Sequence, residues 1–149
     1  MRRSKKTISN LELSVFIHAT EDPQKVLKAV NFILPEEYVE DVKYEKTVLS
    51  GHYRNPIVVM KASIQDTRRV STLLRRVIGT LQLDDLATLS ADFKNYLDSK
   101  GNLYIRFDKQ EAFLGKIKLC TIDPIRIKAR INPNPKTFEE LEIYLKRDG

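Results

Sequence analysis

The chain has 149 residues, of which 42% are hydrophobic and 31% charged, and its formal net charge is +6. This length and composition predict one globular domain with a core of its own and exclude a disordered or fibrous chain. The positive charge favours an anionic partner, and the single cysteine, Cys120, excludes an intramolecular disulfide and indicates a reducing compartment.

Residues 1–9 have no apolar pattern and carry four cations, Arg2, Arg3, Lys5 and Lys6. We interpret them as a flexible basic arm that contacts RNA, and the alternative is a solubilising end without a partner. No signal-peptide pattern follows these cations, and no apolar run approaches the ~18 residues of a membrane helix. We therefore expect a cytoplasmic protein without membrane contact, whose residues 10–149 form a single domain.

Residues 11–20 alternate strictly between apolar and other side chains, which predicts a strand with Phe16 and His18 on its polar face. A helix is expected to follow, because Asp22 is a suitable N-cap and Pro23 fits a first helical turn. Pro35 should end this helix, since proline cannot continue the hydrogen-bond ladder.

Two more strands are predicted over residues 42–49 and 57–64. The connection between them contains the turn residues Gly51, Asn55 and Pro56, which favour a hairpin. Its remaining residues offer RNA contacts, because aromatic rings stack on bases and arginine pairs with phosphate or guanine: His52, Tyr53 and Arg54. The alternative is a purely structural turn.

Asp66 is expected to cap a helix with an apolar stripe from Val70 to Leu81. Four arginines lie opposite this stripe, and we interpret them as an ordinary solvated helix face rather than a binding patch: Arg68, Arg69, Arg75 and Arg76. A further helix is predicted over residues 84–99, with Gly101 as its stop.

Three short strands are predicted over residues 103–107, 116–119 and 125–131, each alternating apolar with polar side chains. Because successive side chains of a strand point to opposite faces, the outward set is rich in cations: Tyr104, Arg106, Lys116, Lys118, Arg126, Lys128 and Arg130. Residues 108–115 suggest one or two helical turns capped by Asp108, from which Lys109 can reach a phosphate. Cys120 is expected to be a buried, inert thiol. A last helix should begin after the breaker at 132–135, at a capping box formed by Thr137 and Glu140.

Strands and helices therefore mix without βαβ alternation. This order predicts an α+β fold in two layers, with helices on one face of a largely antiparallel sheet and the other face open. Cations on such a face neutralise phosphates without sequence choice, Tyr104 can stack on a base, and Phe16 or His18 can do so if their strand adjoins. The alternative is a solvated strand face with acidic partners on the neighbouring strands. The sequence therefore predicts an RNA-binding protein.

Other functions are less favoured. The candidate metal or acid–base groups for a metal-dependent nuclease are His18, Glu21, Asp22, His52 and Asp108. They lie in no recognised catalytic or nucleotide-binding motif, so we expect no enzyme, metal or cofactor. A protein-interaction subunit that docks an acidic partner on the same face remains the main alternative.

Three segments resemble a known family: residues 17–26, residues 50–57, and residues 106–115 together with 123–125. They are similar to small archaeal proteins described as RNA-binding and as predicted exosome subunits. The resemblance runs from about Leu11 to Ile131, and departs from the family at Arg54, where a glycine is expected. It implies a fold similar to the ribosomal protein that binds 5S RNA, and a role in RNA processing or degradation. The partners it implies are RNA and exosome or ribosome components, and a homodimer is a further expectation.

Overall fold

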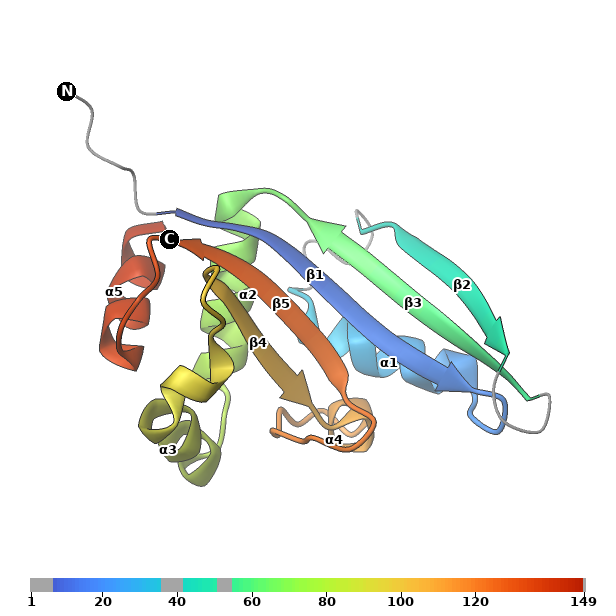
Figure 1. Ribbon diagram of the computed structural model, residues 1–149. Helices are drawn as coiled ribbons and strands as arrows, with labels where there is room; N and C mark the ends of the chain where they lie inside the picture. Colours follow the sequence, from blue (N-terminus) through green and yellow to red (C-terminus); the bar gives the residue numbers. More distant parts are fainter. Residues whose placement is uncertain (1–6, 36–41, 51–54, 149) are drawn as a thin grey trace.

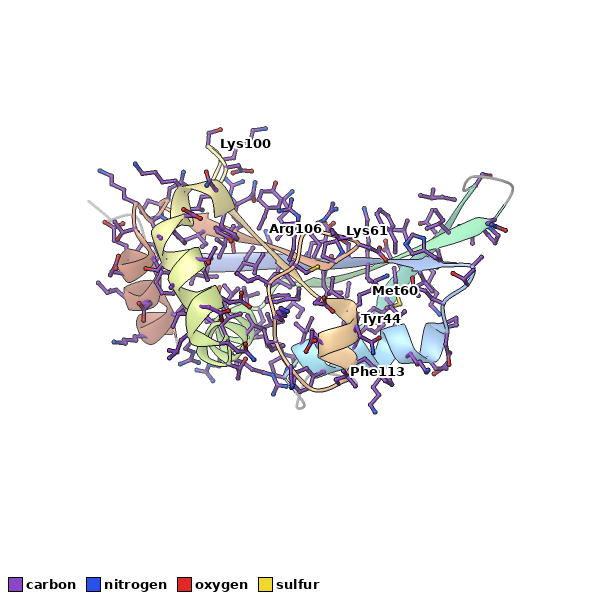
Figure 2. The ribbon with its side chains drawn as sticks, turned by 90° about the horizontal axis from the view of Figure 1, so that it is seen from below. Tyr44, Met60, Lys61, Lys100, Arg106 and Phe113 are labelled. Atoms are coloured by element: carbon purple, nitrogen blue, oxygen red, sulfur yellow. The ribbon has the colours of Figure 1, made fainter. Side chains whose placement is uncertain are left out.

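The computed structural model describes residues 7–35, 42–50 and 55–148 (Figure 1). They form one five-stranded sheet in the order β2-β3-β1-β5-β4, with every neighbouring pair antiparallel. The helices pack against one face of this sheet (Figures 1 and 2). The predicted two-layer α+β fold is therefore confirmed. Within the described ranges, no helix combines the length and the apolar character needed to cross a membrane.

The central strand β1 (Thr7–His18) lies between β3 (Pro56–Ile64) and β5 (Ile125–Asn132). The edge strands are β2 (Tyr44–Ser50) and β4 (Asn102–Phe107). β1 begins earlier than predicted, because residues 7–9 pair with the end of β5 before the register shifts at Asn10. The expected arm of residues 1–9 therefore includes three strand residues, and its cations Arg2, Arg3, Lys5 and Lys6 lie outside the described residues.

The helices begin where the caps were predicted. Asp22 accepts a hydrogen bond from Gln24 N before α1 (Pro23–Ile33), and Asp66 accepts from Arg68 N before α2 (Thr67–Gly79). Asp108 accepts from Glu111 N before the short α4 (Lys109–Phe113). At α5 (Phe138–Asp148), the Thr137 hydroxyl accepts from Glu140 N. The Glu140 carboxylate instead accepts from Lys136 N at 2.8 Å.

The helix predicted over 84–99 was too long. It is α3 (Leu83–Ala91) followed by the 3-10 turn η3 (Phe93–Tyr96). Phe93 is buried and packs edge-on against Phe138 of α5, with ring centroids 6.0 Å apart. This contact between distant segments fixes the chain where local periodicity suggested a continuing helix. Gly101 consequently stops no helix, and instead occupies a left-handed turn (φ 90°) just before β4.

The strand predicted over 116–119 does not form. Lys116 N bonds to Glu111 O and closes α4, so only a single bridge, Phe107 with Leu119, joins this connection to the β4 edge. Cys120 on the same connection is half-buried rather than buried, and its Sγ lies 3.4 Å from Ile122 O.

The core fills the space between the sheet and the helices. Ile127 of β5 is fully buried and lies opposite Leu13 of β1 and Ile105 of β4. Met60 and Tyr44 point to the helical side of the sheet, whereas Lys61 and Arg106 point away from it (Figure 2). The alternation of the strands thus separates an apolar face from an open one.

Candidate nucleic-acid interface

The open face is the side of the sheet that carries Arg106, Arg126 and Lys61, away from the helices (Figure 2). The side chains of β1, β4 and β5 that point to this face are the ones predicted from the sequence. The strand order adds the outward side chains of β2 and β3 to the same face. The residues of β5 that face it are Arg126, Lys128 and Arg130, and their apolar neighbours Ile125, Ile127, Ala129 and Ile131 are buried. The structure therefore places these three cations on one surface.

One row of directly opposed residues crosses all five strands. From β4 to β2 it contains Arg106, Arg126, Ser14, Lys61 and Glu45. We call it the transverse row. Opposed residues have Cβ atoms about 4.5–5.5 Å apart, and like charges at such positions destabilise a sheet. Among the described residues, no carboxylate forms an ion pair with Arg106 or Arg126.

A second set of opposed residues lies beside this row. Tyr104 is opposite Lys128, which is opposite Glu12. Lys128 Nζ lies 5.9 Å from the centroid of the Tyr104 ring, and Tyr104 OH donates to Asp98 Oδ2 at 3.1 Å. Tyr104 is half-buried and held at both its ring and its hydroxyl, so it is a less open stacking surface than the sequence suggested.

Asp98 is a charged anchor for this end of the face. It accepts hydrogen bonds from Asn102 N and Asn102 Nδ2, both at 2.9 Å. These bonds, the backbone one foremost, lower the pKa of Asp98 well below its usual range, against a smaller opposing effect of burial. Its negative charge is therefore retained at low pH and holds Tyr104 in place.

The other predicted contacts are not brought into the sheet. Lys116 and Lys118 are exposed, as predicted, but they lie on the irregular connection beyond β4. His52, Tyr53 and Arg54 lie outside the described residues. Arg76, on the helical layer, has a structural role, since its guanidinium donates to Phe32 O at 2.6 Å and lies over the Phe32 ring.

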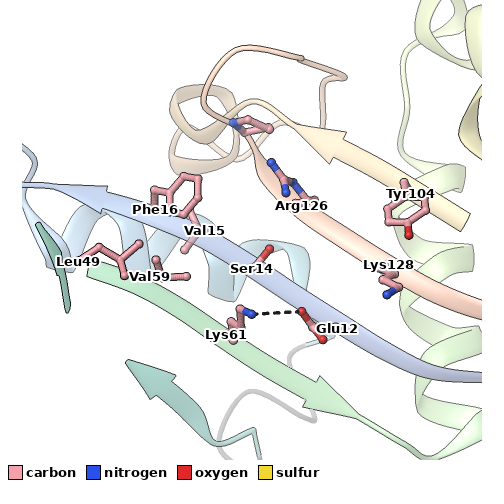
Figure 3. Close-up of a pocket in the computed structure, with 11 residues that line it drawn as sticks. Glu12, Ser14, Val15, Phe16, Leu49, Val59, Lys61, Tyr104, Arg126 and Lys128 are labelled. Atoms are coloured by element: carbon pink, nitrogen blue, oxygen red, sulfur yellow. Dashed lines mark ion pairs between the residues drawn. The ribbon is translucent and has the colours of Figure 1, made fainter. Parts of the chain in front are cut away.

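A pocket of about 450 Å³ opens on this face and includes part of the transverse row (Figure 3). One end is apolar and contains Phe16, Leu49 and Val59. The other end is polar, with Arg126, Lys128, Lys61, Glu12, Ser14 and Tyr104. Glu12 and Lys61 form a loose ion pair of 3.9 Å, with about half of each side chain exposed (55% for Lys61, 46% for Glu12). Such a pair contributes little to stability.

A network of charged groups joins the ends of β1 and β5. Lys109 Nζ lies 2.9 Å from Glu21 Oε1, 2.8 Å from Asp123 Oδ2 and 2.9 Å from Phe16 O. His18 Nε2 lies 3.0 Å from Asp123 Oδ1. We call His18, Glu21, Lys109 and Asp123 the lysine network. An ammonium has three N–H donors, and all three are used here, so Lys109 is not available to a phosphate as the sequence suggested.

Three residues of the lysine network are also candidate ligands for a metal ion. His18, Glu21 and Asp123 have ligand atoms within 4.8 Å of one another, but the Lys109 ammonium already supplies positive charge between the two carboxylates. Burial raises the pKa of Asp123, and hydrogen bonds from Lys109 and His18 outweigh it, so the net pKa is lowered. Two other candidates, Asp22 and Asp108, are helix caps, and His52 lies outside the described residues.

Some residues of the face were missed by reasoning from the sequence. Lys61 alternates with buried Met60 and Ala62, so its outward direction was readable, but its position opposite Ser14 required the strand register. The sequence predicted a strand that contains Leu49 but gave this residue no functional role. Asp123 has a positive φ of 47°, which no local pattern signalled.

The comparisons with known proteins agree with this description. A family model described as RNA binding matches residues 10–131. RNA-binding protein PAB1135 of Pyrococcus abyssi is 38% identical over 131 residues, which are 85% of this chain and 85% of the relative. The uncharacterized protein MJ0213 of Methanocaldococcus jannaschii is 31% identical over 140 residues, 89% of this chain and 91% of the relative. The chain therefore belongs to this archaeal RNA-binding family.

Solved structures share the fold. Protein SSO0741 of Sulfolobus solfataricus superposes with a TM-score of 0.76 at 23% identity, covering 93% of this chain and 98% of that one. Mth689, a DUF54 protein from Methanothermobacter thermautotrophicus, gives a TM-score of 0.69 at 21% identity, covering 95% of this chain and 98% of that one. At these identities the likeness describes the arrangement of strands and helices alone.

Proposed function

We propose that this protein binds RNA non-catalytically through the open face of its sheet. The observation that carries the proposal is the like-charge pair of Arg106 and Arg126, which lie directly opposite each other without a carboxylate partner among the described residues. A sheet tolerates such a pair at a cost in stability. A phosphate between the two guanidinium groups converts that repulsion into two charge-assisted hydrogen bonds.

The proposed contacts are mainly to the phosphate backbone. Lys128 and Arg130 continue the cationic surface along β5, and Lys61 extends it across β1 to β3. Contacts of this kind give affinity without sequence choice. Lys116 and Lys118, on the connection after β4, are proposed as further RNA contacts. The same is proposed for seven residues outside the described part of the chain: Arg2, Arg3, Lys5, Lys6, His52, Tyr53 and Arg54.

The proposed setting is RNA processing or degradation in the cytoplasm of an archaeal cell, as an accessory to the exosome. Two findings support the RNA part of this setting: the family to which the chain belongs is described as RNA binding, and the Pyrococcus abyssi relative is named an RNA-binding protein. Sedimentation of cell extract, with immunodetection of this protein, separates exosome association from ribosome association by size.

A salt titration with matched variants tests the RNA interface. The wild type should bind single-stranded RNA with log K falling by roughly 0.7 per log unit of salt for each neutralised phosphate. The double variant Arg126→Gln, Arg130→Gln should bind more weakly and reduce this slope by about 1.4. The control variant Arg68→Gln, Arg75→Gln removes the same charge from exposed positions on α2 and should leave the slope unchanged.

The alternative function, docking of an acidic protein on the same face, predicts a different outcome. In that case neither RNA binding nor a salt slope is observed, while the protein co-purifies with a partner chain and loses it when Arg126 and Arg130 are replaced. Equal losses of RNA affinity in the two double variants would indicate non-specific attraction to net charge and would also reject the proposed interface.

Analytical ultracentrifugation of the purified chain gives its oligomeric state.

A further inference from the structure

The pocket on the open face has a composition that bare phosphate binding does not explain. Its apolar end contains Phe16, which is 39% exposed, and Leu49, which is 45% exposed. Val59 is only 9% exposed although it lies opposite Phe16 on the open face. Figure 3 shows Phe16, Leu49 and Val59 grouped at this end, apart from Tyr104 and Lys128. The face therefore carries a small apolar cluster of its own, separate from the core.

The cluster is flanked by cations on both neighbouring strands. Ser14 precedes Phe16 by two residues on the same face of β1, and it lies opposite Arg126 of β5 and Lys61 of β3. Diagonal neighbours in a sheet are about 7–8 Å apart, within reach of long side chains. An aromatic ring thus lies beside a row made of a guanidinium, a hydroxyl and an ammonium. Glu12 holds the Lys61 ammonium only loosely, at 3.9 Å, so the row offers positive charge to an anion next to a stacking surface.

We propose that this pocket holds one unpaired nucleotide of an RNA strand. The base stacks on Phe16 and covers Leu49 and Pro124, and its phosphate lies over Ser14 between Arg126 and Lys61. The pocket volume of about 450 Å³ falls within the range of small-ligand sites. The inference rests on the proposed function and adds to it, because a duplex whose bases are all paired has none to place in the pocket.

The lysine network holds the stacking residue in position. The β1–β5 ladder ends at Ser14 with Arg126, so Phe16 has no partner on β5. Lys109 Nζ takes that place by donating to Phe16 O at 2.9 Å, while its bonds to Glu21 and Asp123 fix the ammonium. Pro124, next to Asp123, also lines the pocket. The network thereby acts as a set of positioning residues for the platform.

Tryptophan fluorescence offers a direct measurement, since the chain has no tryptophan. The variant Phe16→Trp places the sole indole on the proposed platform, and a short oligouridylate should quench its emission by stacking. A blunt-ended RNA duplex of equal length should not. The matched control is Leu83→Trp, at an exposed position on α3 away from the sheet, which should respond to neither RNA. Equal responses from both tryptophan variants, or none from Phe16→Trp when it binds the oligouridylate, would overturn the proposal.

Binding measurements separate this proposal from the broader one. Phe16→Ala should weaken oligouridylate binding roughly tenfold or more, and Phe16→Tyr should restore it, because stacking on an aromatic ring contributes at this level. Duplex binding should be unaffected by either substitution. If Phe16→Ala leaves oligouridylate affinity unchanged while the double variant Arg126→Gln, Arg130→Gln lowers it, the proposed nucleotide pocket is rejected and the proposed RNA interface is supported. If the wild type binds neither RNA, both proposals are rejected.

Discussion

Lys109 of α4 and Asp123 of the turn before β5 form an ion pair of 2.8 Å, and the lysine side chain is only 12% exposed. The same ammonium bonds Glu21 after β1 and the backbone of Phe16. Three segments that are far apart in the sequence are thus joined at one end of the sheet. All three carry residues by which the sequence resembles its family.

Removal of this ammonium should destabilise the fold. Lys109→Met leaves two carboxylates and a backbone carbonyl without their shared donor, and we expect the free energy of unfolding to fall by about 2 kcal/mol. Urea denaturation at neutral pH measures it. Lys100→Met, at an exposed position, should change the value by no more than about 0.5 kcal/mol. Equal effects of the two substitutions would mean that the lysine network contributes nothing beyond surface charge.

Acid should weaken the fold through Asp98. Because the folded-state pKa of Asp98 is lowered, its contribution to stability is present above about pH 4, the unfolded pKa, and is lost as the pH falls through the folded pKa. Asp98→Asn should therefore be less stable than the wild type at neutral pH, and the two stability curves should converge toward about pH 2. Urea denaturation at a series of pH values tests this, and parallel curves would contradict it.

The pairing of Arg106 with Arg126 predicts opposite effects on stability and binding. Arg126→Gln removes one member of a like-charge pair, so the free energy of unfolding should rise by about 0.5 kcal/mol at low ionic strength. The gain should shrink near 1 M salt, where the Debye length is about 3 Å. RNA affinity should fall in the same variant. A loss of stability that does not depend on salt would show that Arg126 has a stabilising partner instead.

Replacing two different glycines by alanine should have different effects on the stability of the fold. Gly101 has a φ of +90°, and a Cβ there would meet the Asn134 side chain and Ile131 O, so Gly101→Ala should cost about 2 kcal/mol or more. Gly79 is in α2 with no heavy atom within 4 Å of a Cβ, and Gly79→Ala should be neutral or stabilise by about 0.5 kcal/mol. Thermal unfolding of both variants provides the comparison, and similar shifts in both would refute the assigned turn geometry.

Much of this fold was readable from local chemistry. The period of two in residues 11–20 and 125–131 predicted which side chains are buried, because a half-buried strand must alternate. The first prediction ran two residues too far, since β1 ends at His18 and Ala19 is exposed. Asp22, Asp66 and Asp108 were predicted as caps, since a carboxylate next to free backbone N–H groups needs no distant partner. The helix predicted over 84–99 failed because the contact of Phe93 with the distant Phe138 overrides local preference. The strand predicted over 116–119 failed because Lys116 N closes α4 by bonding to Glu111 O.

The candidate site likewise has one part that local sequence predicts and another that only the tertiary structure shows. The sequence alone determined that Arg126, Lys128 and Arg130 share one side of a strand, because that follows from the geometry of a single chain segment. Only the tertiary structure decided that Arg106 and Lys61 extend this surface, that Ser14 beside Phe16 lies between two cations, and that Lys109 is engaged by carboxylates instead of facing solvent. Those relationships depend on strand order and register, which are set by the packing of residues distant in sequence.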